Sequence, residues 1–205
     1  MSWLDTPYDY NTWLEASDRW PVGKWAGAEE WAADMAEAWW GDFPADPGET
    51  GVELLTRTLV ACARDFPKAH PGCRVLLHLP DPREMPLPVY VTDRRAQGES
   101  SAALRAFVLA DDPEAVEPPI VEDFAVPAGV GGLRSLRYAT VPGSADLMVG
   151  LRYAWRSVEH GRDVVVLTAS PAPGRVLAAL EDIDELVRGF RVRHDDDDPE
   201  IEDDD

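Results

Sequence analysis

The sequence predicts an α+β domain, with helices covering one face of a mostly antiparallel sheet. Apolar residues recur at helical spacing in the first third of the chain and near its end, whereas residues 133–169 show the short alternating segments and tight turns of paired strands. A chain of 205 residues can also bury one core without disulfides. We therefore expect a tryptophan-rich arm and helix at 1–50, an α+β domain at 51–193 and an acidic tail at 194–205.

Seven of the eight tryptophans lie in the first forty residues. Residues 26–40 place Trp31, Met35 and Trp39 at i, i+4 and i+8, which predicts an amphipathic helix packed on the core. Residues 1–25 show no sustained period. We expect an extended or short-helical arm there.

The arm contains candidate partner-binding residues, because tryptophan is enriched among the interface residues that contribute most to binding. Leaving one indole exposed forgoes about 4 to 6 kcal/mol of burial, so this chain or a second molecule must cover it. Two alternatives stay open for Trp3, Trp13 and Trp20: contact with a partner protein or a second copy of the chain, and packing within the chain.

Regular elements follow the first helix in a clear order. Thr50 and Glu53 form a capping-box pattern, which predicts a second helix that begins there and ends at Pro67. The spacing of apolar residues then shortens to that of strands. The expected strands are 74–79, 87–92, 120–126, 133–141, 147–158 and 163–169, and further helices are expected at 100–109 and from 173 to 189.

The region after residue 133 carries the strongest pattern. Odd positions of residues 147–155 are apolar, which indicates a strand with one buried face, and residues 183–190 read IDELVRGF at the end of the closing helix. In this order of elements residues 133–193 resemble the C-terminal half of PsbP-like and LpqN-like domains. The resemblance covers under a third of the chain and implies an antiparallel sheet backed by helices, in a binding or accessory module rather than an enzyme.

The formal net charge is −20, and residues 195–205 hold nine carboxylates. Such a field repels polyanions, so the composition argues against binding to nucleic acid or to an anionic membrane surface. The tail is expected to be disordered, because a charge run buries no apolar surface. Cys62 and Cys73, with no N-terminal signal segment, predict a cytoplasmic protein with reduced thiols. Seventeen arginines against two lysines are typical of GC-rich bacterial coding.

One basic stretch interrupts this acidic chain. Between residues 124 and 158 one acid, Asp146, stands against four arginines. Guanidinium groups recognise carboxylate and phosphate bidentately, so a cluster of them is a candidate site for an anion or an acidic partner. The alternative is a solvated sheet face with ion pairs inside the chain. The four candidate residues are Arg134, Arg137, Arg152 and Arg156.

No sequence pattern identifies a catalytic centre, a metal site or a cofactor. The glycines of residues 129–132 lack the lysine of a phosphate-binding loop, and His70 with Cys62 and Cys73 lacks a fourth metal ligand. Whether the protein is an enzyme stays undecided, with an enzyme as the less favoured class. We expect a non-enzymatic cytosolic interaction or accessory protein that binds another protein through the aromatic arm and an exposed sheet face. The alternative is a carrier of an apolar or anionic small molecule.

Overall fold

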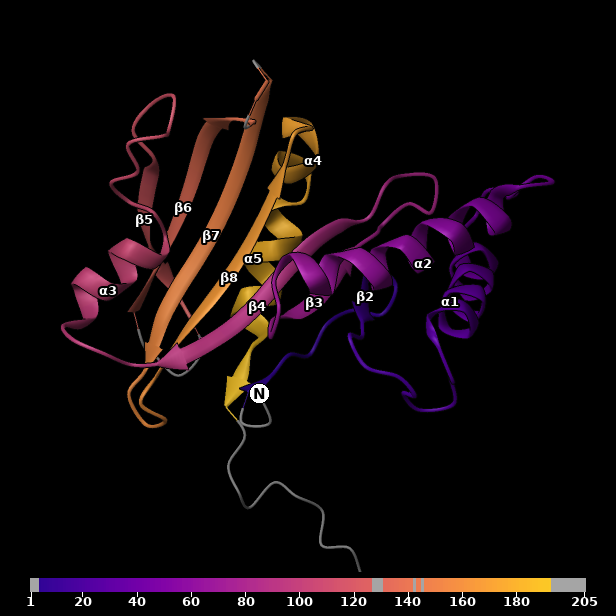
Figure 1. Cartoon of the computed structure of the whole chain (residues 1–205), viewed down its shortest axis with the longest axis horizontal. Helices are drawn as coiled ribbons and strands as arrows, with labels where there is room; N and C mark the ends of the chain where they lie inside the picture. The colour runs from indigo at the N-terminus through magenta and orange to yellow at the C-terminus, as the bar shows by residue number, and fades with distance from the viewer. Residues whose placement is uncertain (1–3, 127–130, 142, 145, 193–205) are drawn as a thin grey trace, which may run out of the picture.

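The computed structural model describes residues 4–126, 131–141, 143–144 and 146–192. Within these residues the chain forms a seven-stranded antiparallel sheet, a two-stranded ribbon and five helices (Figure 1). This arrangement confirms the predicted α+β class. Trp3 and the acidic tail lie outside the described residues.

The main sheet has the strand order β2-β3-β4-β8-β7-β6-β5, and every neighbouring pair is antiparallel. Each strand on either side of the contact between β4 and β8 pairs with the strand next to it in chain order, and α1 and α2 lie in the connection between β2 and β3. That contact joins the two halves of the sheet at its centre. The strands are β2 (Trp13–Ala16), β3 (Arg74–His78), β4 (Leu87–Arg95), β5 (Ile120–Ala125), β6 (Gly131–Thr140), β7 (Leu147–Ser157) and β8 (Arg162–Ser170).

The N-terminal arm is built into the two sheets. β2 pairs with β3 and places Trp13 opposite His78. The two-stranded ribbon consists of β1 (Leu4–Asp5) and β9 (Arg191–Val192), so the two ends of the described chain meet there. Of the two conformations expected for residues 1–25, these segments adopt the extended one, because their backbone groups complete sheet ladders.

Helices cover both faces of the sheet, which corrects the prediction of one covered face. α4 and α5 pack on the face that carries Tyr153, and α1, α2 and α3 pack on the opposite face. The reason lies in β8, where the consecutive residues Val164, Val165 and Val166 are at most 4% exposed, so both faces of this strand are apolar. The helices are α1 (Ala28–Asp42), α2 (Gly51–Ala69), α3 (Ser100–Phe107), α4 (Pro173–Ala178) and α5 (Leu180–Gly189).

Helix ends differ from the sequence prediction in three places. Pro67 lies inside α2, which continues to Ala69, because a proline in the last turn removes only one backbone hydrogen bond. Thr50 makes no side-chain cap, whereas Glu99 caps α3 by accepting hydrogen bonds from the next turn. The closing helix is divided at Ala179 into α4 and α5.

The alternation predicted for β7 is confirmed over most of its length. Val149, Leu151, Tyr153 and Trp155 are at most 4% exposed and face α4 and α5, whereas Leu147, at the start of the strand, is 44% exposed. The sheet is thus anchored by one apolar face against the C-terminal helices. Its other face carries the residues from which the candidate sites are built.

Candidate functional site

The predicted partner-binding tryptophans do not form one surface. Trp13 is 3% exposed and packs in the core shared with α5, its ring centroid 4.9 Å from that of His78. Trp20 lies on the other side of the sheet, half-buried, 6.2 Å from the ring of Trp31. Trp13 therefore offers no ring surface to a partner, because intramolecular packing already covers it.

The four candidate arginines are divided between the two faces of the sheet. Arg134 stands opposite Tyr153 in the β6–β7 ladder, and its Nη1 lies 2.6 Å from Asp184 on α5. Arg137 and Arg152 point to the opposite face, as the alternation of side chains along each strand requires. The four guanidinium groups therefore do not form the common cluster that the sequence suggested.

Internal carboxylates pair with three of the four arginines. Arg137 Nε lies 2.6 Å from Asp112 Oδ2, and Arg156 Nε donates to Asp163 Oδ1 at 2.6 Å. Arg134 binds Glu122 and Asp184 together. For these three arginines the pairs support the alternative interpretation of the basic stretch, in which its arginines form ion pairs inside the chain.

An apolar recess lies beside α1, and we call it the arm pocket. It has a volume of about 480 Å³ and opens between residues 10–14, the C-terminal half of α1 and Pro80, which follows β3. Aromatic and aliphatic side chains form most of its wall, and among the described residues Asp42 is the one charged residue lining it. The arm pocket is lined by Tyr10, Asn11, Leu14, Met35, Ala38, Trp39, Asp42, Phe43 and Pro80.

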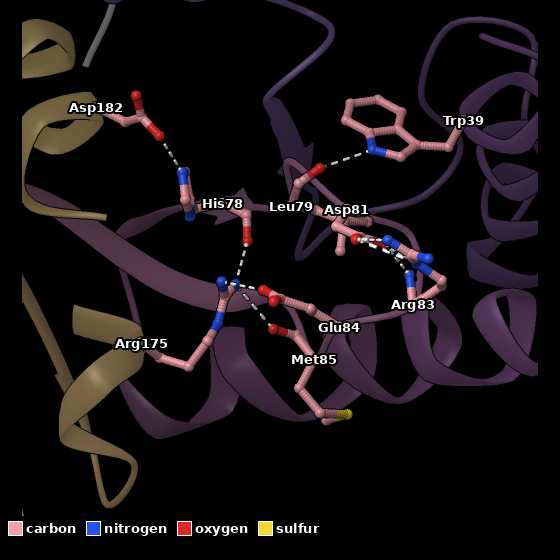
Figure 2. A network of polar contacts seen from close by, with 9 residues as sticks. All are labelled: Trp39, His78, Leu79, Asp81, Arg83, Glu84, Met85, Arg175 and Asp182. Carbon is pink, nitrogen blue, oxygen red and sulfur yellow. Dashed lines mark hydrogen bonds and ion pairs between the residues drawn. The ribbon is translucent and has the colours of Figure 1, made fainter. Parts of the chain in front are cut away.

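Hydrogen bonds and ring contacts fix the walls of the arm pocket. The indole N–H of Trp39 donates to the carbonyl oxygen of Leu79 at 2.7 Å (Figure 2). Phe43 makes a T-shaped contact with Trp40, with ring centroids 5.9 Å apart, and the guanidinium carbon of Arg83 lies 5.2 Å from the centroid of its ring. Both Trp39 and Phe43 therefore have contacts outside the pocket that orient their rings.

The loop that contains Pro80 is held by one contact within the loop and by others from α4. Arg83 Nε donates to Asp81 at 2.9 Å within the loop, and Arg175 on α4 donates to the carbonyl oxygen of Met85 at 3.1 Å (Figure 2). Arg175 also pairs with Glu84. This turn between β3 and β4 is therefore tied to α4 as well as to α1.

A buried histidine stands behind the same loop. His78 is 2% exposed, and its Nε2 lies 2.7 Å from Asp182 Oδ2 on α5 (Figure 2). Burial lowers the pKa of His78, and the neighbouring Asp182 opposes this shift. The ring is thus neutral at pH 7, donating from Nε2, while its Nδ1 is buried and has no hydrogen-bond partner in the described residues. A ring with so little exposure joins β3 to α5 and has no access to a substrate.

Sequence reasoning assigned Met35 and Trp39 to the packed helix stripe and did not find the pocket. Trp31 and Trp40 are at most 7% exposed, but Met35 and Trp39 are only partly buried. The adjacent pair Trp39 and Trp40 was the available signal. Neighbouring residues of a helix point about 100° apart, so two bulky rings in succession seldom both face the core.

No family model matches the chain, and no curated protein matches it. Among the described residues, no helix has the length and apolar character needed to cross a membrane, and no group of three or more acidic, histidine or cysteine side chains is arranged to hold a metal ion.

Proposed function

We propose that this protein is a non-enzymatic cytoplasmic interaction or accessory protein, which holds an apolar anchor side chain of a partner protein in the arm pocket. The observation that carries the proposal is the aromatic wall that Trp39, Phe43 and Tyr10 form in the arm pocket. Tyr10 is 76% exposed although its ring contacts Tyr8 at 5.0 Å. Tryptophan and tyrosine are enriched among the interface residues that contribute most to binding, which supports a partner-binding role for these rings.

Charge indicates which kind of partner fits the pocket. Asp42 lines its edge, and the chain as a whole carries −20. The nearby cation, Arg83, is already bound to Asp81. An apolar anchor flanked by lysine or arginine would therefore meet complementary charge and associate faster than a neutral segment. The partner of this proposal is a basic segment with one exposed apolar side chain.

The volume of the arm pocket also supports a second candidate, a carrier of a small apolar molecule. Its volume of about 480 Å³ lies within the range of roughly 300 to 1,000 Å³ that is usual for ligand pockets. This candidate agrees with the binding role implied by the resemblance of residues 133–193 to PsbP-like and LpqN-like domains. That resemblance stays a prediction.

The test uses two tryptophan substitutions at neighbouring exposed positions of α1. Ala38→Trp fills the mouth of the arm pocket, whereas Glu37→Trp adds the same bulk beside it, since Ala38 lines the pocket and Glu37 does not. A partner would be captured from the native cell, purified and titrated into each variant. We expect Ala38→Trp to weaken binding by about tenfold or more and Glu37→Trp to leave it unchanged.

Two outcomes contradict the proposal. Equal binding by both variants would show that the partner does not use the arm pocket. A small molecule released on denaturation of the native protein, and absent from Ala38→Trp, would favour the carrier instead.

A further inference from the structure

A second surface lies on the sheet between α3 and α2, at some distance along the sheet from the arm pocket. Register places Arg152 beside Leu167 and Gly150 beside Ala169 on the neighbouring strands β7 and β8. These four residues share one face because they are separated by two positions along each strand. Figure 1 shows β7 and β8 running between α3 and α2. We call the four residues the Arg152 surface.

Arg152 differs from Arg137 and Arg156, the other two arginines of β6 and β7 on this face, in having no carboxylate partner within the described residues. Asp112 pairs with Arg137, and Asp163 pairs with Arg156. The hydrogen bond that Arg152 makes is from Nη1 to the carbonyl oxygen of Phe107, at 3.1 Å, at the end of α3. A guanidinium group has five N–H donors, so this bond leaves a donor edge of the half-buried side chain for another acceptor.

The surroundings of Arg152 have a local surplus of positive charge. Burial lowers the pKa of Arg152, and the nearby charge of Arg137 lowers it further, against the weaker attraction of Asp112. The pKa of His70 is lowered too, first by burial and then by Arg152, so this imidazole adds no charge at pH 7. An anion placed here would relieve the cost of a partly desolvated cation in a chain of −20.

The floor next to Arg152 is apolar and open. Leu167 is partly buried and Ala169 is exposed. A Cβ atom added at Gly150 would meet only the carbonyl oxygen of Thr168, at 3.8 Å. An apolar group can therefore lie flat on these three residues while a charged group reaches the guanidinium.

We propose that the Arg152 surface binds a small organic acid, with the carboxylate on the guanidinium of Arg152 and the apolar body over Gly150, Leu167 and Ala169. A carboxylate is planar and accepts two parallel hydrogen bonds from one guanidinium. It also carries one negative charge, which matches the single positive charge of the Arg152 guanidinium. This inference is independent of the partner proposed for the arm pocket.

The test is a titration followed by amide NMR, with 4-phenylbutyrate as the probe. Two further compounds serve as comparisons: 4-phenyl-1-butanol has the same body without the charge, and inorganic phosphate has charge without the body. We expect the carboxylate to bind about tenfold or more tightly than the alcohol and to shift the amides of Gly150, Leu167 and Ala169. Arg152→Gln should remove this preference.

Matched variants exclude a general loss of structure. Arg105→Gln removes an exposed cation of α3 that Asp111 already neutralises, so it should bind the probe like the native protein. Gly150→Val fills the apolar floor, keeps Arg152 and should block the probe even if Arg152→Gln fails to fold. Equal binding of acid and alcohol, tighter binding of phosphate, or no shift at these three amides would each overturn the proposal.

Discussion

Trp39 and Leu79 are joined by a hydrogen bond of 2.7 Å from the indole N–H to the carbonyl oxygen, which ties α1 to the residue after β3. Leu79 is fully buried, so its carbonyl has no water to replace a lost donor. The bond therefore stabilises the fold and also sets the orientation of the ring that lines the arm pocket. The two roles can be separated by experiment.

Trp39→Phe keeps an aromatic wall and removes the donor. We expect the free energy of unfolding to fall by about 1 to 2 kcal/mol, because the Leu79 carbonyl loses its partner in a buried place. Trp25→Phe is the matched control, since its N–H donates at 2.9 Å to Asp34, an exposed carboxylate. That loss should be below about 0.5 kcal/mol. Equal losses in urea denaturation would contradict this interpretation.

Trp13 and Trp20 should differ in what their removal costs. Trp13→Ala should lower the free energy of unfolding by about 3 to 5 kcal/mol, because it empties a packed site at 3% exposure. Trp20→Ala should cost less, about 1 to 2 kcal/mol, since the ring is only half-buried. Sizing chromatography and denaturant melts would check both variants. A stable Trp13→Ala protein that changes its oligomeric state would restore the arm as an interface.

The elements of this fold could be predicted because they depend on local periodicity. The strand at 147–158 and the helix at 26–40 were found within a few residues of β7 and α1. Alternation alone also showed that Arg152 and Tyr153 face opposite ways. Such patterns are properties of a short segment, and tertiary contacts do not need to be known.

The candidate sites could not be predicted because they depend on pairing between distant segments. Which face Arg134 occupies follows from its register opposite Tyr153, and its acid, Asp184, comes from a helix 50 residues later. The face of the sheet opposite Tyr153 is covered in part by α3, which packs on Ala154 and Val165 about 50 to 60 residues further along the chain. A stripe of apolar residues says that a helix is buried on one side, but not which sheet face receives it.

Leu151 and Arg152 test the register of β7 directly. Leu151 is fully buried, so Leu151→Asp places an unpaired carboxylate in the core and should abolish folding. Arg152→Ser should cost about 1 kcal/mol or less, since the side chain is half-buried and makes one hydrogen bond to Phe107. Far-UV circular dichroism and thermal melts would show the difference. Similar tolerance at both positions would mean that the two faces are assigned wrongly.

The stability of the protein should depend on pH through His78. Its pKa in the folded state is lowered from the usual 6.5, chiefly by burial. The unfolded chain therefore binds a proton more tightly than the folded chain, so stabilisation is complete above pH 6.5 and is lost as the pH falls below it. Protonation would also add an N–H at Nδ1, which is buried and without an acceptor in the described residues.

His78→Gln isolates this effect, because the glutamine amide can still donate to Asp182 and does not titrate. As the pH falls below about 6.5, the native protein should lose up to about 1.4 kcal/mol per pH unit more than the variant, the limit for one proton. His70→Gln is the control for the other histidine whose pKa is lowered. Urea denaturation at several pH values gives the slopes. The contrary outcome is that His78→Gln keeps the native dependence of the free energy of unfolding on pH, whereas His70→Gln removes it. In that case the titrating group is His70, the exposed histidine at the end of α2. His78 would then keep one protonation state in the folded protein throughout this pH range.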